Sequence, residues 1–591
     1  MTTTPAAIQK RKTPTIGEAL IFRGKTLLLQ LNRRSRDLLS VKIKTFPRTA
    51  DRKPQPVIAN SKTPLWTETE PGERILLAGK IHNLRLAIRE LDGLEIPAGE
   101  VFSFWKHIGR TTRLRGFVAG RELREGCIIP NIGGGLCQIS NALYDAALQA
   151  NFAIVERHAH TQVIPGSLAE QGRDATVFWN YVDLRFKSQN AFRIEAKLDG
   201  DNLTVVFKGE KPKSAKLHKI ERTPVNDHSP NSCATCEQGD CNRMIKLPED
   251  PNFGNTAFLV DEFSAEFDGY IQSSRTAKDS LFTPLDGKRF KKANYAWITD
   301  GFSSVNQSLY VTAIRSYRSR KLSAQGKARQ LNLLSMYEKL AESYARKLKF
   351  DVLHVVVQQN LLPFLWKGGH LGGRTFDVLM TALPMSELQN RLDSAASIHP
   401  ESTTLGDFRA DKELLAAETD ALKHARRIIT PHTGIASLFP DNAELLGWKM
   451  PVVTTPERPQ NSKPRIVFPT STVGRKGCYE IREALSGMNI TLVLLGPVVE
   501  DQEFWHGLDV EKGGGDWMDN ADLVLLPALI EHKPQRLLRA AAAGIPVIAS
   551  TACGVENVVG IESIDAGDAE SLRRAIRRVI DVQEKSEPPC N

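Results

Sequence analysis

The strongest constraint on the fold of this chain is a regular alternation of short apolar runs and longer helical stretches after about residue 251. Such alternation is typical of βαβ units, in which helices join parallel strands. A proline-rich segment at 451–464 interrupts the pattern. The pattern therefore predicts two Rossmann-like lobes. The expected strands lie at 352–357, 426–430, 465–468, 491–496, 522–527 and 546–550.

Length and composition limit the class of protein. A chain of 591 residues is too long for one hydrophobic core. At a typical domain length of about 150 residues, it predicts about three or four units. No run approaches the roughly 18 apolar residues of a membrane span, and the first residues lack the apolar core of a secretory signal. The eight cysteines are irregularly spaced, unlike a secreted disulfide framework. We therefore expect a cytoplasmic protein.

The formal charge of +10 is concentrated partly in the N-terminal segment. A basic amphipathic stretch at 16–41 can lie on an anionic membrane surface, on the inner membrane face. The residues that would enter the headgroup boundary are Leu27, Leu28, Leu29 and Leu31. A surface helix with a solvated polar face is an equal alternative, because helical period does not separate the two. Nucleic acid is not an expected partner, since no recognition module accompanies the charge.

A glycine turn stands directly in front of a second expected helix. Three glycines occupy 133–135 and are followed by Leu136 and Cys137, and residues 138–148 carry apolar side chains at helical spacing. Glycines allow positive φ and a close backbone approach. Cys137 is then expected in the first turn or at the N-cap, where unpaired amides and the helix dipole favour a thiolate.

Candidate partners for this thiol follow soon after the helix. His158 and His160 are candidate bases, and Asp174 is a candidate orienting carboxylate. Together with Cys137 they supply the residue types of a nucleophilic Cys-His-Asp site. The alternatives are a small apolar thiol behind the turn and histidines that cap or solvate a strand end. Those alternatives correspond to a structural thiol or a noncatalytic binding pocket.

These motifs resemble the VanW family. The resemblance covers about residues 74–208 and rests on Gly-Gly-Gly-Leu-Cys-Gln, Glu-Arg-His-Ala-His and Gly-Arg-Asp-Ala. It implies a fold and a motif but no reaction. The residue pattern itself predicts a mixed α+β domain. The expected elements are a helix at 73–91 and antiparallel strands at 193–198 and 203–208.

The last part of the chain resembles retaining glycosyltransferases of the GT-B fold, over about residues 250–582. The segments that carry the resemblance lie at 476–485, 495–496, 521–527, 531 and 542–550. The resemblance implies a nucleotide-sugar donor. The departing diphosphate of such a donor builds up negative charge, which cations and helix N-termini stabilise.

The same resemblance assigns roles to individual residues. Lys476 matches the phosphate-binding lysine, with Arg475 beside it, and Glu531 matches the first glutamate of a paired-glutamate motif that touches the donor sugar. Gly544, with Ala542 and Ala543 before it, leaves room for close backbone approach. His354 is expected near the reaction centre. The alternative for Lys476 and Glu531 is a capped surface helix and a solvated loop.

Two positions depart from the family pattern. Ser471 stands where an arginine is frequent, although Arg475 can substitute for it. Arg539 stands where a second glutamate would hold the ribose hydroxyls of the donor. A guanidinium donates hydrogen bonds where a carboxylate accepts them, which disfavours an ordinary nucleotide-sugar donor at this position. The alternatives are a different phosphorylated ligand and a lobe without catalysis.

A cluster of thiols lies between the two expected parts. His228, Cys233, Cys236 and Cys241 supply one imidazole and three thiols. This donor set can hold a tetrahedral zinc ion, or an iron–sulfur cluster that takes one outside ligand. A disulfide, a redox pair or loose thiols are the alternatives, because a second Cys-x2-Cys pair is missing.

Together these features predict a multidomain α/β protein. The expected parts are a basic leader and linker (1–72), a VanW-like domain (73–212), a cysteine-rich connector (213–250), a first GT-B-like lobe (251–455), a second or donor lobe (456–582) and a tail (583–591). The expected function is glycosyl transfer to a glycan or lipid-linked acceptor, in bacterial cell-envelope or surface-polysaccharide metabolism. The alternatives are a thiol-dependent acyl or peptide transferase centred on Cys137, and a noncatalytic envelope-associated binding protein.

Overall fold

The computed structural model divides the protein into two compact units. Unit 1 consists of Met1–Asn255 with Lys349–Leu353 and Gly369–Arg374, and unit 2 holds Thr256–Leu348, His354–Gly368 and Thr375–Asn591. No helix within the described ranges is long and apolar enough to cross a bilayer. The structure describes residues 15–39, 43–49, 53–67, 71–124, 127–160, 164, 166–179, 181–211, 231–232, 253–322, 326–407, 409–453, 463–515 and 517–585.

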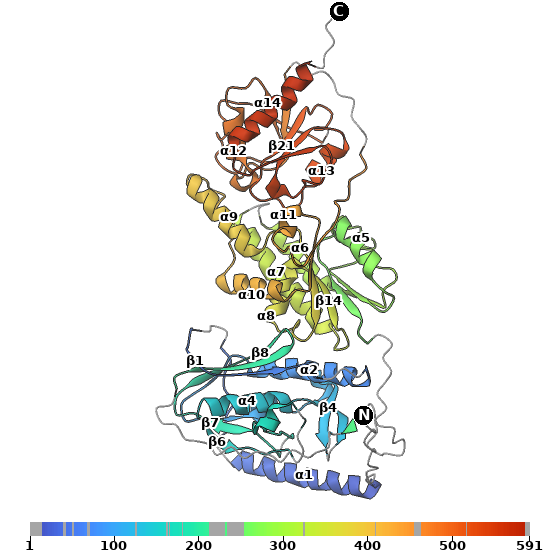
Figure 1. Ribbon diagram of the computed structural model, residues 1–591, viewed down its shortest axis with the longest axis vertical. Coiled ribbons are helices and arrows are strands. Elements are labelled where there is room, and N and C mark those ends of the chain that lie inside the picture. The colour runs from blue at the N-terminus through green and yellow to red at the C-terminus, as the bar shows by residue number, and fades with distance from the viewer. Residues whose placement is uncertain are drawn as a thin grey trace, which may run out of the picture. The chain divides into compact units, whose positions relative to one another are not determined.

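Unit 1 is a mixed α+β unit with small sheets (Figure 1). One antiparallel sheet has the strand order β1-β9-β8-β2, and the others have the orders β3-β7-β6 and β10-β5-β4. The strands are β1 (Val57–Pro64), β2 (Leu94–Ile96), β3 (Val101–Ser103), β4 (Ala119–Arg124), β5 (Cys127–Ile132), β6 (Ala153–Glu156), β7 (Arg185–Lys187), β8 (Phe192–Asp199), β9 (Asn202–Gly209) and β10 (Asn231–Ser232). The helices are α1 (Ile16–Leu39), α2 (Pro71–Leu91), α3 (Phe104–Ile108) and α4 (Cys137–Gln149), with 3-10 turns η1 (Arg113–Arg115) and η2 (Leu168–Gln171).

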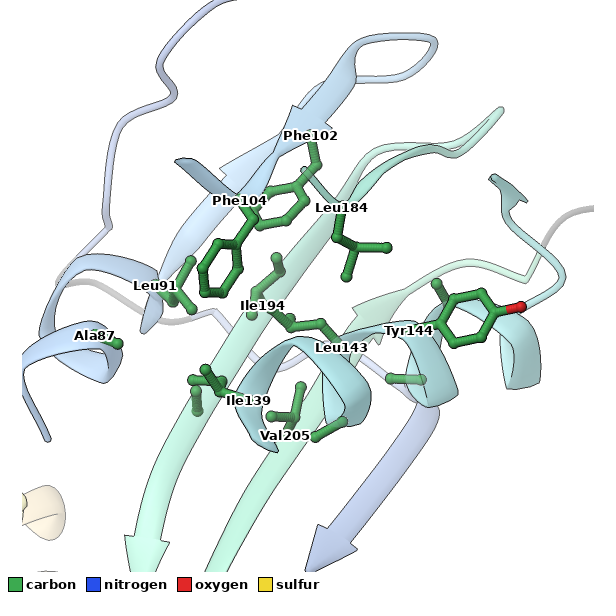
Figure 2. Packing of buried hydrophobic residues seen from close by; sticks show 14 of the residues in the cluster. Ala87, Leu91, Phe102, Phe104, Ile139, Leu143, Tyr144, Leu184, Ile194 and Val205 are labelled. Atoms are coloured by element: carbon green, nitrogen blue, oxygen red, sulfur yellow. The ribbon is translucent and has the colours of Figure 1, made fainter. Parts of the chain in front are cut away.

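The core of unit 1 forms where α4 packs on the sheet that contains β8 and β9. Ile139 and Leu143 of α4 are fully buried and lie in one cluster with Ile194 and Val205 of the strands. Figure 2 shows these side chains together with Phe102 and other members of the cluster. Burial of each such side chain contributes about 1.5–3 kcal/mol. This packing fixes the start of α4, and hence Cys137, relative to the sheet.

The predictions for unit 1 are confirmed for its main elements and differ from the structure in the linker before α2. The helix predicted at 73–91 is α2, and the predicted antiparallel strands are β8 and β9. The linker predicted before residue 72 contains β1, which pairs antiparallel with β9 along seven residue pairs. Alternating buried positions in β1 explain why this polar segment forms an edge strand.

Unit 2 contains two parallel sheets, as the alternation of strands and helices predicts. The first lobe has a seven-stranded sheet of order β13-β12-β11-β14-β15-β16-β17, and every neighbouring pair is parallel. Its strands are β11 (Thr256–Leu259), β12 (Ser280–Thr283), β13 (Ser304–Gln307), β14 (His354–Gln358), β15 (Thr375–Leu379), β16 (Arg427–Thr430) and β17 (Ala443–Leu445).

Helices cover both faces of this first sheet, as in a doubly wound fold. Figure 1 shows α5 on one face and α7, α8 and α10 on the other. The helices are α5 (Ala265–Ser274), α6 (Leu309–Arg320), α7 (Lys327–Lys347), α8 (Leu362–Lys367), α9 (Met385–Ile398), α10 (Lys412–His424) and α11 (Thr433–Ala436), with η3 (Ala293–Tyr295) and η4 (Gln359–Leu361).

The second lobe has a six-stranded parallel sheet of order β20-β19-β18-β21-β22-β23. Its strands are β18 (Arg465–Phe468), β19 (Thr491–Leu494), β20 (Asp509–Lys512), β21 (Leu523–Leu526), β22 (Val547–Ser550) and β23 (Ile561–Ile564). Its helices are α12 (Cys478–Leu485), α13 (Gln535–Ala542) and α14 (Ala569–Lys585), with η5 (Gly474–Lys476) and η6 (Thr551–Cys553). The six strands predicted across the two lobes each coincide with an observed strand within two residues.

Each parallel sheet reverses its winding direction at one place. In the first lobe the reversal lies between β11 and β14, and in the second it lies between β18 and β21. Ligands of doubly wound sheets bind in the crevice beyond the carboxyl ends of the strands at such a switch point. The loops that follow β18 and β21 are therefore the places where a ligand site of the second lobe is expected.

Hydrogen bonds join the two lobes of unit 2. The carboxylate of Glu500 in the second lobe accepts from Ser402 Oγ at 2.9 Å and from the backbone N–H of Thr403 at 3.0 Å, both in the first lobe. It also accepts from the N–H of Gly474 at 2.7 Å, in the loop after β18. This carboxylate thereby ties the first lobe to the loop at the switch point.

Candidate functional site

The glycine turn of unit 1 places Cys137 at the first residue of α4. Gly133 and Gly135 have φ values of 80° and 97°, which L-residues with side chains rarely adopt. A Cβ atom on Gly135 would lie 2.1 Å from Cγ of Lys80 on α2. The turn therefore needs glycine both for its backbone conformation and for its close packing against α2.

A histidine and an aspartate meet this thiol from the segment after β6. His160 Nδ1 lies 2.5 Å from Asp174 Oδ1, and the backbone N–H of His160 donates to Asp174 Oδ2 at 2.6 Å. Asp174 is fully buried. Because this carboxylate occupies the Nδ1 side of the ring, the Nε2 side of His160 is available to Cys137.

The thiol and the imidazole change each other's proton affinity. Burial alone would raise the pKa of Cys137, but the charge of His160 and a hydrogen bond with it lower that pKa. Burial alone would lower the pKa of His160, but the Cys137 thiolate and the hydrogen bonds with Asp174 and Cys137 raise it. Both shifts favour a thiolate–imidazolium pair, the reactive form of such a site.

The two candidate histidines differ in their surroundings. The His158 side chain is 50% exposed, and its Nε2 lies 3.4 Å from Glu156. The His160 side chain is 16% exposed and contacts both Asp174 and Cys137. The structure therefore brings Cys137, His160 and Asp174 together and leaves His158 beside Glu156.

Unit 2 contains a pocket of about 240 Å³ at the switch point of its second lobe. The loop after β18 contributes Arg475 and Lys476, and α9 of the first lobe contributes two leucines. The lining residues are Leu388, Leu392, Arg475, Lys476, Ile530, Glu531, His532 and Lys533. Three sequence-predicted residues, Arg475, Lys476 and Glu531, therefore line one crevice between the lobes.

Lys476 and Glu531 form an ion pair in this pocket. Lys476 Nζ donates to Glu531 Oε2 at 2.8 Å and to the carbonyl of Ile530 at 3.1 Å. The other carboxylate oxygen accepts the N–H groups of His532 and Lys533, both at 2.9 Å. Burial alone would raise the pKa of Glu531, but the Lys476 charge and hydrogen bond lower it, so Glu531 stays ionised.

Several pocket residues were not singled out by the sequence pattern. Burial and the charge of Lys476 lower the pKa of His532 to about 3, so its imidazole is neutral at pH 7. Lys533 forms an ion pair with Glu262, which follows β11 at the switch point of the first lobe. The adjacent Asp261 is fully buried and accepts from Arg315 Nη1 at 2.6 Å. The only sequence signal for His532 and Lys533 was their position directly after Glu531.

Other expected donor-site residues lie outside the pocket. Arg539, on α13, is exposed, and so is Gly544, which has a φ of 71°. Neither residue lines the pocket. Ser471 lies in the loop after β18, where its backbone leaves no space for a Cβ on Gly496. A role for Arg539 or Gly544 in donor binding remains a prediction.

The structure does not place His354 at the pocket, so its role near the reaction centre stays a prediction. His354 is the first residue of β14, at the amino end of the strand, whereas ligands of such sheets bind beyond the carboxyl ends. Its Nδ1 lies 2.9 Å from Thr375 Oγ1, and its Nε2 lies 3.4 Å from the buried carboxylate of Asp377. His354 therefore belongs to a polar cluster at the edge of the sheet that faces away from the pocket.

The predicted metal ligands His228, Cys233, Cys236 and Cys241 lie outside the described residues. The zinc or iron–sulfur site at these residues stays a prediction. The cysteines with described environments are Cys127, Cys137, Cys478 and Cys553, and all four are free thiols.

Comparisons with known proteins agree with both parts of the chain. Residues 79–208 match the family model described as VanW like protein. Residues 481–581 match the model described as Glycosyl transferases group 1. The chain joins a VanW-like segment to a glycosyltransferase-like segment. The VanW-like segment contains Cys137, His160 and Asp174, and the glycosyltransferase-like segment contains Glu531.

Two curated proteins resemble the chain over a limited length. The chain is 32% identical over 145 residues to the uncharacterized protein YoaR of Bacillus subtilis, covering 24% of this chain and 47% of YoaR. It is 30% identical over 162 residues to the vancomycin B-type resistance protein VanW of Enterococcus faecalis, covering 26% of this chain and 58% of VanW. The chain thus spans about half the length of these relatives.

Among solved structures, the chain is similar to a sucrose-phosphate synthase from Thermosynechococcus elongatus. The TM-score is 0.37 at 15% sequence identity, over 55% of this chain and 90% of that chain.

Proposed function

We propose that unit 2 transfers a sugar from a nucleoside-diphosphate donor bound at the pocket between its lobes. The observation that carries the proposal is the placement of Lys476 and Glu531 in one crevice beyond the carboxyl ends of β18 and β21. Doubly wound sheets bind nucleotides at such a switch point. The match of residues 481–581 to a glycosyltransferase family supports the same reaction class.

The chemistry of the donor explains the residue types at the pocket. The ammonium of Lys476 and the guanidinium of Arg475 would stabilise the charge that builds up on the diphosphate as the sugar departs. Glu531 is ionised and accepts hydrogen bonds, so it can orient the hydroxyls of the donor sugar. The acceptor would be a glycan or a lipid-linked sugar of the cell envelope. The relative VanW is a vancomycin B-type resistance protein, which supports that cellular context.

The departure at Arg539 bears on how the donor ribose would be held. Arg539 is exposed on α13 and does not line the pocket. A carboxylate for the ribose hydroxyls would then have to come from another residue. We propose that Glu262, which is paired with Lys533 at the pocket rim, is available for that role.

The test of glycosyl transfer is hydrolysis of a panel of nucleotide sugars by the full chain. We expect release of nucleoside diphosphate from at least one donor, and loss of that release in Glu531→Ala. Glu483→Ala, which changes an exposed glutamate on α12, is the matched control and should keep the activity. Binding of a nucleoside diphosphate without hydrolysis of any donor would favour the noncatalytic binding protein instead.

We also propose that α1 attaches the protein to the inner, anionic face of a membrane, which would place a cytoplasmic enzyme beside lipid-linked acceptors. The helix contacts the rest of unit 1 through polar side chains. Gln30 Nε2 donates to the carbonyl of Trp179 at 3.1 Å, and Arg33 forms an ion pair with Glu156 at 2.6 Å. Figure 1 shows α1 on the side of unit 1 that carries β6 and β7.

Five apolar residues of α1 with described side chains lie on the opposite face. At about 100° per residue, Leu20, Ile21 and Leu28 fall within an arc of about 120°, away from Gln30 and Arg33. The exposed members of this stripe are Leu20, Ile21, Leu27, Leu28 and Leu31, each at least 53% exposed. An ordinary surface helix turns such a stripe toward the core, so this orientation favours a lipid surface as the occupant.

The charge of the helix complements an anionic surface. The segment Ile16–Leu39 holds five basic residues and two acidic ones, a net charge of +3. The full chain should therefore sediment with vesicles of equimolar phosphatidylglycerol and phosphatidylcholine, and not with phosphatidylcholine alone.

The double variant Leu28→Glu/Leu31→Glu should abolish this sedimentation, because each leucine contributes about 1.5–3 kcal/mol when buried in lipid. Leu114→Glu changes a fully exposed leucine elsewhere in unit 1 and should have no effect. Equal sedimentation of the double variant and the control would contradict membrane attachment through α1.

A further inference from the structure

We propose that unit 1 contains a second active site, at which Cys137 attacks the carbonyl carbon of an acyl group held as an amide or an ester. The site consists of a nucleophile at a helix start, a base with an orienting carboxylate, and a set of backbone amides for the developing oxyanion. It lies in the VanW-like segment and does not depend on the function proposed for unit 2.

The three side chains are arranged as a nucleophile, a base and an orienting group. Asp174 accepts from both the ring and the backbone N–H of His160, at 2.5 and 2.6 Å. This double contact fixes the ring and its tautomer, so that Nε2 exchanges a proton with Cys137. Asp174 touches no substrate in this arrangement and is a positioning residue.

Backbone amides complete the site at the start of α4. The N–H of Gly133 donates to Val118 and that of Gly134 donates to Asn131. In the described part of the chain, the next three amides, of Gly135, Leu136 and Cys137, have no hydrogen-bond acceptor. These N–H groups are therefore free to bind the oxyanion of a tetrahedral intermediate on Cys137, and each such donor contributes about 10²–10³ in rate.

The environment of Cys137 differs from that of the other thiols for which a shift is resolved. Burial, with the charges of Glu500 and Glu480, raises the pKa of Cys478, and burial with Glu531 raises the pKa of Cys553 to about 12. Those two thiols stay protonated in the cores of unit 2. Cys137 is partly exposed, its sulfur lies 3.8 Å from Thr176 Oγ1, and His160 lowers its pKa.

The reaction balances without a further reagent. The thiolate of Cys137 forms a C–S bond to the acyl carbon, and the C–N or C–O bond to the leaving group breaks. The leaving amine or alcohol takes the proton from Nε2 of His160. A water molecule, amine or alcohol then gives its proton back to His160 and attacks the thioester, which releases the acyl group and restores the thiolate.

The test uses the full chain and two acyl probes, the ester p-nitrophenyl acetate and the amide acetyl-alanine p-nitroanilide. Mass spectrometry of the intact and digested protein would locate the acyl group. We expect one acyl group on Cys137 as a thioester, with loss of that group in hydroxylamine. Acylation by the ester alone would restrict the substrate to esters, and acylation by both would include amides.

Three variants separate catalysis from structure. His160→Gln should slow acylation of Cys137 by at least about 100-fold at pH 7, the lower range of general base contributions. Asp174→Asn should shift the pH profile of acylation, because it removes the orienting carboxylate. His158→Gln is the matched control and should leave the rate unchanged, since that side chain pairs with Glu156.

A measurement on the unaltered chain guards against variants that fail to fold. The rate at which iodoacetamide alkylates Cys137 should remain high below pH 7, because the imidazolium of His160 keeps the thiolate. An alkylation rate that rises only near the pKa of a free cysteine, about 8.5, would contradict the proposal. Absence of an acyl group on Cys137 after exposure to both probes would also overturn it.

Discussion

Replacement of Glu531 by glutamine separates phosphate binding from sugar transfer at the pocket of unit 2. Glu531 is 9% exposed and holds the ammonium of Lys476 at 2.8 Å. Glutamine keeps the shape of the side chain and can still accept the N–H groups of His532 and Lys533. It removes the negative charge and the accepting oxygen that compete with a donor diphosphate for Lys476.

The size of the effect follows from this one contact. In the variant the amide NH₂ takes the place of Oε2, so the hydrogen bond from the ammonium of Lys476 is lost. A hydrogen bond to a charged group contributes about 1.5–3 kcal/mol, and a loss of about 1.5 kcal/mol corresponds to about a tenfold change in an equilibrium constant. Glu531→Gln should therefore bind a nucleoside diphosphate about tenfold more tightly. Hydrolysis of the donor should fall, because the hydroxyls of the donor sugar have lost the carboxylate that accepts their hydrogen bonds.

Isothermal titration calorimetry with uridine, guanosine and adenosine diphosphates measures the affinity directly. Glu483→Gln, on the exposed face of α12, is the matched control. Lys476→Met should lose binding, because the cation itself is removed. Thermal unfolding of each variant checks that the pocket is intact, since an unpaired and largely buried Lys476 destabilises the fold.

An unchanged or weaker affinity in a folded Glu531→Gln would refute this reasoning. It would mean that Lys476 does not exchange Glu531 for phosphate when the ligand binds. The pocket would then need another cation as its phosphate ligand.

Two further predictions concern stability. Gly477→Ala should lower the free energy of unfolding by about 2 kcal/mol more than Gly487→Ala, as measured in urea. Both glycines have positive φ, but only a Cβ on Gly477 meets an atom, the Pro527 carbonyl oxygen at 2.1 Å, so equal losses would contradict the packing. Burial and the charge of Arg85 lower the pKa of His82 to about 4. Below pH 6.5 the imidazole of His82 binds a proton in the unfolded chain but not in the folded chain. The free energy of unfolding should therefore fall as the pH is lowered from 6.5 to about 4. His82→Gln should reduce that dependence, and an unchanged pH profile would exclude His82 as its source.

The parallel lobes were predictable because their strands are short, apolar and regularly spaced. Buried runs such as those of β19 and β21 stand out between helical stretches, and the parallel order then places the following loops at one edge. The resemblance to GT-B glycosyltransferases assigned Lys476 and Glu531 to the donor site, and the parallel order explains why both line one crevice. The same rule places His354 at the opposite edge of its sheet, because this residue begins its strand rather than following it.

The reactive cluster of unit 1 could be predicted as a set but not as a geometry. His158 and His160 are two residues apart, so they have the same parity in an extended chain and periodicity does not separate them. Only the contact with Asp174, fourteen residues later along the chain, selects His160. The free amides before α4 follow from glycine conformations that the sequence suggested but could not specify.

Contacts between distant segments were not predictable. Arg85 on α2 donates through Nε and Nη2 to the carbonyl of Gly372, which is 287 residues away in sequence. Local patterns place residues 349–353 and 369–374 among the loops of the first lobe, yet they pack in unit 1. The edge strand β1 was missed for a similar reason, because its polar residues become a strand only when β9 pairs with it.

The discontinuity of unit 1 affects the order in which this protein can mature on the ribosome. The loop 369–374 packs tightly in unit 1, because a Cβ on Gly373 would collide with Ile81. The N–H of Gly373 also donates to the Gly200 carbonyl at 2.7 Å. During translation, the first unit cannot complete its packing until the loop ending at Arg374 has emerged from the exit tunnel. A gene fragment that stops before this loop should therefore yield an aggregation-prone product, even though it encodes the whole VanW-like segment.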